Sequence, residues 1–356
     1  MKRLVPVLFV LFGMLGITVP SSSASAECYQ WSGVESLESA AAAHSCIDIV
    51  PGTYAIPDSV DLWATHTING NGATLIAQGP FWELSPLRAN DSIFIVHTGA
   101  KLTASNLTLD GANVASYLVT PGGYTLSNMT FLNSGCSALG VMRSGAVVRD
   151  SLFVHHAWNC IWFSGLPLGA AIYAQHNNDQ QYHFSPVITG NTFRDVYGPA
   201  LDSNGVWGGT FSGNNVVGMT GWAAVSIFGG SYWKIENNTV SHRPSDLIQD
   251  FHPACVPNPA KSAAIFLCQD VTYLPWLTNF NVVSGNKAAG FYGILLIGDD
   301  ERIPWVTPRL TTVTNNDVRG SHVGCFDDLL IGQWYDGNTW TGNNCAGTPN
   351  TGPLRK

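Results

Sequence analysis

The chain has 356 residues, of which 45% are hydrophobic and only 11% are charged, and its formal net charge is −8 at pH 7. This acidic balance argues against a nucleic acid or an anionic membrane as the main partner. The low charge together with 12 tryptophans favours neutral sugars over heavily anionic polysaccharides as ligands.

The first 26 residues have the features of an export signal. Lys2 and Arg3 form a basic start, Leu4–Ile17 is apolar, and the small residues before Glu27 fit a cleavage site. We therefore expect cleavage near Ala26 and secretion to an extracellular or periplasmic location. No later run is long and apolar enough to predict a membrane span.

A helix is predicted over Val34–Ala43, where Val34, Leu37 and Ala41 share one face. We expect this amphipathic helix to cap the N-terminal end of the fold, within a region covering residues 27–45. Repeating coils are expected over residues 46–345, followed by a tail at 346–356, so that residues 27–356 form a single domain.

Asparagine or aspartate recurs at one place in a repeating phrase, after a β-rich run and before a short apolar run. The nine positions are Asn106, Asn128, Asp150, Asn191, Asn215, Asn238, Asn286, Asn316 and Asn344. Repeats of roughly 20–50 residues indicate a solenoid. Asparagine at a coil bend tolerates left-handed backbone, and its amide can bond to the next asparagine in the stack.

The first strand of each coil gives two neighbouring columns. The column that we expect to face inward is Ile95, Leu118, Val141, Ile161, Leu201, Ser226, Phe266, Leu295 and Leu329. The column that we expect to face outward is Val96, Val119, Met142, Trp162, Asp202, Ile227, Leu267, Leu296 and Leu330. The mostly aliphatic columns suit a stack of parallel strands.

The run IDIVPGTY, followed by TINGNGATL and then by the asparagine phrases, resembles the pectin-lyase-like superfamily. The resemblance covers roughly Cys46 to Cys345 and implies an all-β fold, a single-stranded right-handed parallel β-helix. Because that superfamily includes lyases, hydrolases, epimerases, transferases and binding proteins, the resemblance implies carbohydrate as ligand without fixing an activity.

Eight cysteines suit an oxidising compartment. Their spacing suggests neighbouring pairs, although the sequence does not fix the connectivity. The expected bridges are Cys28–Cys46, Cys136–Cys160, Cys255–Cys268 and Cys325–Cys345.

Trp162 and Asp202 interrupt the apolar outward column, and an indole beside a carboxylate is a common way to build a sugar subsite. The alternative is that Asp202 caps a turn and Trp162 fills a gap under a loop. Insertions rich in polar and aromatic residues surround the pair and are expected to wall a groove. The candidate catalytic residues are Asp202, Asp250, Asp195 and His156; the candidate substrate-binding residues are Trp158, Trp162, Trp222, Tyr173 and Arg143.

The sequence predicts a polysaccharide-active enzyme that cleaves or rearranges a glycosidic bond with paired carboxylates, and two alternatives remain open. A glycoside hydrolase or transferase needs two carboxylates, for which Asp202 is the candidate acid and Asp250 or Asp195 its partner. A polyuronate lyase or epimerase needs a base such as His156 or Tyr173 and neutralising cations. The third function is non-catalytic carbohydrate binding. We expect a polysaccharide or oligosaccharide as partner and no cofactor, with calcium held by loop carboxylates as an alternative; the oligomeric state is not predicted.

Overall fold

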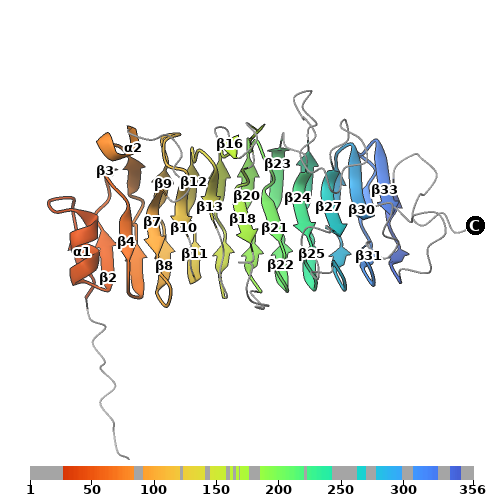
Figure 1. Cartoon of the computed structure of the whole chain (residues 1–356), viewed down its shortest axis with the longest axis horizontal. Coiled ribbons are helices and arrows are strands. Elements are labelled where there is room, and N and C mark those ends of the chain that lie inside the picture. The colour runs from red at the N-terminus through yellow and green to blue at the C-terminus, as the bar shows by residue number, and fades with distance from the viewer. Residues whose placement is uncertain are drawn as a thin grey trace, which may run out of the picture.

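A computed structural model describes residues 27–83, 91–120, 123–140, 145–157, 161–162, 166–167, 169–175, 185–219, 223–242, 263–269, 278–298, 308–327 and 337–345. The predicted export signal and the predicted tail lie outside these ranges. Three long sheets run side by side along the molecule, with successive coils following one another from the N-terminal to the C-terminal end (Figure 1).

Each sheet takes one short strand from each coil. Sheet A contains β1 (Tyr29–Trp31), β2 (Cys46–Ile49), β5 (His66–Asn69), β8 (Lys101–Ser105), β11 (Gly123–Ser127), β14 (Val147–Arg149), β19 (Val187–Thr189), β22 (Gly209–Ser212), β25 (Trp233–Glu236), β28 (Val282–Ser284), β31 (Thr312–Thr314) and β34 (Thr339–Thr341). Sheet B contains β3 (Thr53–Ile56), β6 (Thr74–Ala77), β9 (Thr108–Asp110), β12 (Thr130–Leu132), β15 (Leu152–Val154), β20 (Thr192–Arg194), β23 (Asn215–Met219), β26 (Thr239–His242), β29 (Lys287–Ala289), β32 (Asp317–Val318) and β35 (Asn344–Cys345). Sheet C contains β4 (Val60–Leu62), β7 (Ser92–Val96), β10 (Tyr117–Thr120), β13 (Ser137–Leu139), β18 (Ile172–Gln175), β21 (Leu201–Asn204), β24 (Ala223–Phe228), β27 (Ala263–Gln269), β30 (Tyr292–Gly298) and β33 (Val323–Asp327).

The chain visits the sheets in the order A, B, C and then returns to A, and every pairing within these three sheets is parallel. This arrangement confirms the predicted all-β parallel β-helix. The exception to the parallel pairing among the described strands is an antiparallel hairpin, β16 (Ile161–Trp162) with β17 (Leu166–Pro167), which lies outside the three sheets.

The predicted helix forms but begins later than expected. Helix α1 (Leu37–Ala43) starts after Ser36, whose Oγ accepts a hydrogen bond from the Ser39 N–H at 3.1 Å. Val34 therefore lies outside the helix and is 94% exposed, so the predicted apolar face is wrong at that residue. Leu37, Ala40 and Ala41 are buried. A second, four-residue helix is α2 (Pro80–Glu83), and no helix in the described ranges is long and apolar enough to cross a bilayer.

The space between the three sheets is filled by apolar side chains stacked from coil to coil. Phe131, Phe153 and Phe193 are fully buried, and successive ring centroids lie 4.6 Å apart. This spacing matches the distance of about 4.8 Å between neighbouring strands. The stacking therefore follows from the register, because each ring lies above its equivalent in the next coil.

A row of six asparagines, buried except at its C-terminal member, runs through the bends between sheets A and B. Each side-chain amide except the last donates to the Oδ1 of the next asparagine at 2.8–3.1 Å. The row consists of Asn191, Asn214, Asn238, Asn286, Asn316 and Asn343. We call it the asparagine ladder.

The predicted stacking of asparagines is confirmed, with corrections to its membership. Asn215 and Asn344 are exposed and begin strands, so the ladder uses the preceding residue in each case. Asn106, Asn128 and Asp150 occupy the position just before the ladder, with φ of 51–54°. They serve the left-handed part of the bend, for which asparagine and aspartate are suited.

The disulfides Cys28–Cys46 and Cys325–Cys345 form as predicted. The first joins residues at the N-terminal coil, and the second joins β33 to β35 at the other end. Cys136 and Cys268 are also disulfide-bonded, whereas Cys160 and Cys255 lie outside the described residues.

Candidate functional site

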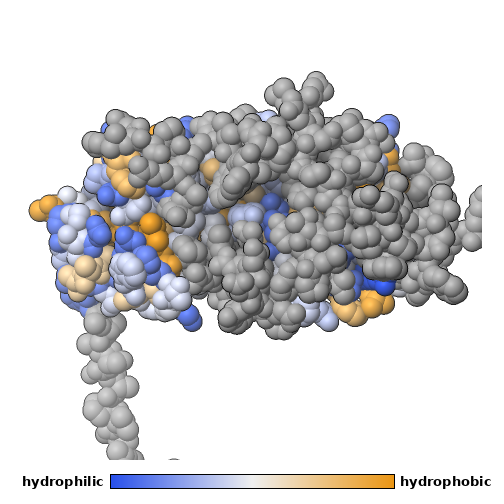
Figure 2. Space-filling model, viewed as in Figure 1, coloured by the Kyte–Doolittle hydropathy of each residue, from blue (hydrophilic) through white to orange (hydrophobic). Residues whose placement is uncertain are grey.

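The outer face of sheet C carries one continuous column of side chains, fixed by the pairing register. From the N-terminal end, part of this column reads Asp61, Ile95 and Thr120, and a later part reads Tyr173, Asp202, Ser226, Phe266, Leu295 and Phe326. We call it the outer column. In the space-filling view, hydrophilic atoms of the described residues are visible in the hollow at the middle of the molecule (Figure 2).

This register corrects the predicted columns. Leu201 pairs with Val225, and Asp202 pairs with Ser226, so Ser226, Phe266 and Leu295 were assigned to the wrong face. Val96 and Val119, expected outside, are fully buried in the core. The alternation of the strands was predicted, but the alignment between coils was shifted by one residue, which exchanges the two faces.

Asp202 lies in the middle of this face and is partly buried. The Ser226 hydroxyl donates to its Oδ1 at 2.9 Å, and the Asn204 side chain is a second hydrogen-bond partner. Burial, which disfavours the charged form, raises the pKa of Asp202 from 3.8 to about 6, although both hydrogen bonds act in the opposite direction. The carboxyl is therefore able to hold a proton at mildly acidic pH.

Asn204 is 5% exposed, on the same strand as Asp202 and two residues along it. Residues two apart on a strand point to the same side. Its Oδ1 is buried and has no hydrogen-bond partner, which costs about 1–3 kcal/mol when it stays unsatisfied. The Asn204 Oδ1 is therefore an unsatisfied acceptor close to Asp202, enclosed by the protein and not open to the surface.

Tyr173 is the predicted site residue that the structure places next to Asp202, since the two are register partners on β18 and β21. Trp162 is not in that position. It belongs to the β16–β17 hairpin, whereas the coil strand next to β21 is β18. The predicted pairing of Trp162 with Asp202 on adjacent strands is therefore wrong, and Tyr173 is the aromatic neighbour.

Asp195 and His156 lie apart from the outer column. Asp195 is exposed, follows β20 of sheet B, and has a φ of 52° at the bend. His156 is fully buried. Its Nδ1 accepts hydrogen bonds from the N–H and hydroxyl of Ser134, and its Nε2 donates to the Phe131 carbonyl at 3.1 Å. Burial lowers the pKa of His156 to about 3. Because both ring nitrogens are engaged inside the core, we leave His156 out of the proposed site.

Arg143, Trp158, Trp222 and Asp250 lie outside the described residues, as does the Trp162 side chain. No group of three or more His, Cys, Asp or Glu side chains within the described ranges is arranged to hold a metal ion.

A polar and aromatic group at the N-terminal end of the same face was missed from the sequence. His97 Nε2 lies 2.6 Å from Asp61 Oδ1, and the His97 ring stacks on Trp63 with centroids 3.4 Å apart and planes 7° apart. The string DLW around Trp63 precedes the first asparagine phrase, so the repeat did not align it with the later coils.

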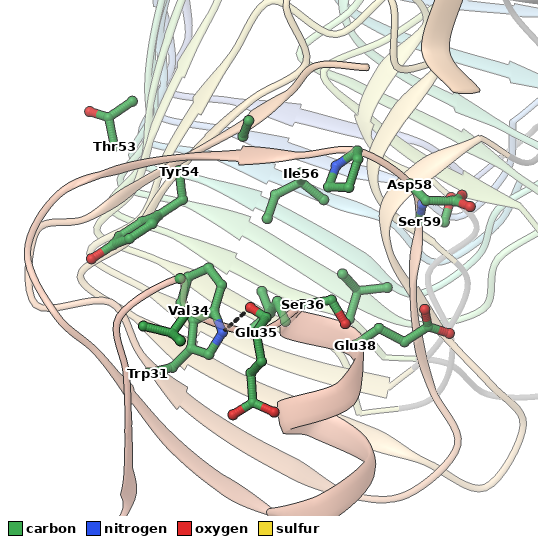
Figure 3. A pocket seen from close by; sticks show the side chains of 15 residues that line it. Trp31, Val34, Glu35, Ser36, Glu38, Thr53, Tyr54, Ile56, Asp58 and Ser59 are labelled. Atoms are coloured by element: carbon green, nitrogen blue, oxygen red, sulfur yellow. Dashed lines mark hydrogen bonds between the residues drawn. The ribbon is translucent and has the colours of Figure 1, made fainter. Parts of the chain in front are cut away.

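A pocket of about 480 Å³ lies between the start of α1 and strands β3 and β4 (Figure 3). Trp31 and Tyr54 pack against each other there, with ring centroids 4.7 Å apart. The polar groups nearby are used locally: the Trp31 indole donates to the Glu35 carbonyl at 3.0 Å, and the Tyr54 hydroxyl donates to the Val50 carbonyl at 2.8 Å. The pocket is a packing gap at the end of the fold, so the outer column is the stronger candidate site.

No protein-family model matches the chain, and no curated protein matches it. Among solved structures, the tailspike protein of an Acinetobacter baumannii phage has a TM-score of 0.51 and 12% identity, covering 88% of this chain and 52% of that protein. A mannuronan C-5 epimerase A-module from Azotobacter vinelandii has a TM-score of 0.45 and 11% identity, covering 90% of this chain and 89% of the module. The catalytic domain of an alpha-1,3-glucanase in complex with nigerose has a TM-score of 0.44 and 12% identity, covering 91% and 70%.

The tailspike likeness extends to the fold alone, and this chain spans about half of the tailspike's length. The other two likenesses are too weak to support a conclusion about this chain. Together with the three parallel sheets, the comparison shows that the chain has the right-handed parallel β-helix fold.

Proposed function

We propose that this protein acts on a polysaccharide bound along the outer face of sheet C, cleaving or rearranging a glycosidic bond with Asp202 as general acid. The observation that carries the proposal is the environment of Asp202, a partly buried carboxyl with a pKa of about 6. A carboxyl that keeps its proton near the working pH is what protonation of a leaving oxygen requires.

The neighbours of Asp202 suit a sugar. Tyr173 and Ser226 flank it in the outer column, and the side chains of Ser226 and Asn204 hydrogen-bond its carboxyl. For the second carboxylate we retain Asp250 as the proposed partner, because Asp195 lies apart from the outer column.

Non-catalytic carbohydrate binding is the competing function, and one observation favours it. In the described part of the outer column Asp202 has no second carboxylate on an adjacent strand, since its register partners are Tyr173 and Ser226. A lone carboxyl beside a tyrosine suits recognition as well as catalysis.

The pH dependence of turnover distinguishes these functions. A general acid works in its protonated form, so kcat/KM on a cleaved polymer should fall as the pH rises through the Asp202 pKa of about 6. Asp202→Asn should lower kcat by about 100-fold or more and remove that limb of the profile. Turnover that survives in the variant with an unchanged profile would contradict the acid role, whereas binding without any turnover would support recognition.

We further propose that the protein is exported through its first 26 residues and that α1 covers the open N-terminal end of the solenoid. The disulfides suit an oxidising compartment. Helix α1 packs three buried side chains toward the first strands, and its Ala41 carbonyl is 2.8 Å from the His66 Nε2.

A further inference from the structure

We propose that Trp63 is a sugar-stacking platform, a second binding position for the same polysaccharide on the same face of sheet C. This inference rests on the proposed function, because it takes the chain of sugars to lie along the outer column. It adds a position far from Asp202 and therefore predicts a minimum length for the substrate.

Trp63 is exposed and yet held in place. Its side chain is 72% exposed, although one face of the indole is covered by the stacked His97 ring. His97 is in turn fixed by its 2.6 Å contact with Asp61, and its backbone N–H donates to the Leu62 carbonyl at 3.0 Å. His97 can cover one face only, so the opposite face of the indole is available to a ligand.

An exposed tryptophan that is held in one orientation contributes less to folding stability than a buried one. Leaving a large aromatic side chain in water forgoes the free energy that its burial would contribute. Fixing that side chain before binding, however, reduces the entropy lost when a ligand arrives. The stacked His97 and its Asp61 partner supply this fixing, and neither is fully buried, with exposed fractions of 27% and 35%.

A pyranose ring fits the group better than a protein surface does. Its C–H face matches the open face of the indole, and its hydroxyls can donate to the exposed Asp61 carboxylate. A stable protein interface buries about 800 Å² per partner, whereas one large aromatic side chain supplies roughly 150–250 Å². The other large hydrophobic residues that are exposed in the described ranges lie off the outer face of sheet C: Val34, Val50, Val217, Tyr232, Phe280 and Leu310.

Asp61, which holds His97 against Trp63, lies in the same column as Asp202. Asp61 and Ile95 are register partners in the same outer column that contains Asp202. Strands β4 and β21 are five places apart in the order of sheet C, so the two positions are separated by about 24 Å at about 4.8 Å per strand. One strand spacing is close to the length of one sugar unit in an extended chain, so this separation corresponds to roughly five units.

The experiment measures binding by isothermal titration calorimetry, which needs no turnover. The probes are a linear neutral glucan and a linear polyuronate, each as polymer and as oligosaccharides of two to eight units, with full-length mature protein. The variants are Trp63→Ala, Trp63→Phe and, at an exposed aromatic on another part of the surface, Tyr232→Asn. Asparagine is chosen there because Tyr232 has a φ of 61°.

We expect Trp63→Ala to weaken binding of the polymer and of the longest oligosaccharides by about tenfold. Oligosaccharides of two or three units, which are too short to reach from Asp202, should bind as they do to the wild type. Trp63→Phe should retain most of the affinity, and Tyr232→Asn all of it. His97→Ala should lose part of the affinity and have no further effect when Trp63 is already alanine.

The binding results distinguish failure of the Trp63 platform from failure of the proposed function. Unchanged polymer binding in Trp63→Ala, with binding that depends on Asp202, would overturn the platform and leave the proposed function standing. An equal loss for short and long oligosaccharides would also overturn it, because Trp63 would then belong to the Asp202 position itself. If neither probe binds the wild type, the proposed function fails as well. Because Trp63 is mostly exposed, its removal should leave the unfolding midpoint unchanged, and a large shift would assign Trp63 a structural role instead.

Discussion

At the scale of single residues, Asp202 links the packing of the solenoid to its chemistry. Its position in sheet C lets the fold withdraw the carboxyl from water, while Ser226 and Asn204 keep it hydrogen-bonded. Burial dominates, and the pKa rises to about 6. The same environment that equips the carboxyl to donate a proton makes its ionised form a cost to stability.

We predict that Asp202→Asn stabilises the fold above pH 6 and not near pH 4. Between the ordinary value of 3.8 and the folded value of about 6, the folded state holds a proton that the unfolded state has lost. Stability contributed by this group is therefore lost as the pH rises through that window. Asparagine cannot ionise, so the variant should be more stable by about 1–3 kcal/mol at about pH 8.

Urea unfolding at both pH values measures this difference, with Asp195→Asn as the control because Asp195 is an exposed carboxylate. A variant that is less stable than wild type at the higher pH would show that the ionised carboxylate is stabilised in the fold.

The sequence identified Asp202 as a carboxylate among apolar neighbours, but not its surroundings. In β24 the residues Ala223–Phe228 are buried on both faces, so hydrophobicity does not reveal a slip of one residue. For the same reason Ser226 was placed inside. The sequence predicted Trp162 as the aromatic neighbour of Asp202, whereas the structure places Tyr173 there. A hairpin interrupts the coil between β15 and β18, and the repeat alone did not show which strand continues sheet C.

At the scale of elements, the asparagine ladder fixes the bends that join sheets A and B. Asn238 shows its full set of bonds: its amide donates to Asn286 Oδ1 and to the Phe211 carbonyl, both at 2.9 Å, and its Oδ1 accepts from Asn214. All of these groups are buried, so a missing partner leaves polar atoms without a hydrogen bond.

We predict that Asn238→Ala destabilises the protein by about 2–4 kcal/mol, because it leaves the Phe211 carbonyl and the Asn214 donors unpaired. The matched control is Asn215→Ala, at an exposed asparagine that follows a ladder residue, for which we expect a change within about 0.5 kcal/mol. The unfolding midpoint in urea measures both. Similar losses in the two variants would show that the ladder contributes no more than an exposed asparagine.

The sequence predicted that asparagines stack but not which member of each pair does so. In Asn214-Asn215 and Asn343-Asn344 either residue fits the spacing, and the choice depends on which one points inward. The helix was predicted in the correct region, but its start was misplaced because Ser36 is the cap and Val34 matched the apolar spacing by chance.

At the scale of the whole molecule, a solenoid has no single centre, so function depends on which face is accessible over many coils. The outer column of sheet C places Asp61 near one end and Asp202 in the middle. Beyond Asp202 the same face becomes apolar and buried, with Phe266, Tyr292 and Leu295 in a second hydrophobic cluster. The described polar part of the face therefore extends from the N-terminal coils to Ser226.

The most direct test of this account is a panel of neutral and uronic polysaccharides incubated with the mature protein and with Asp202→Asn, with products analysed by mass and by reducing ends. If Asp202 is the general acid, the wild-type protein should form new reducing ends from a linear polymer and no unsaturated products, and the variant should show neither the mass shift nor the reducing ends. Unsaturated products, or the same products from Asp202→Asn, would contradict the assignment of Asp202 as the acid.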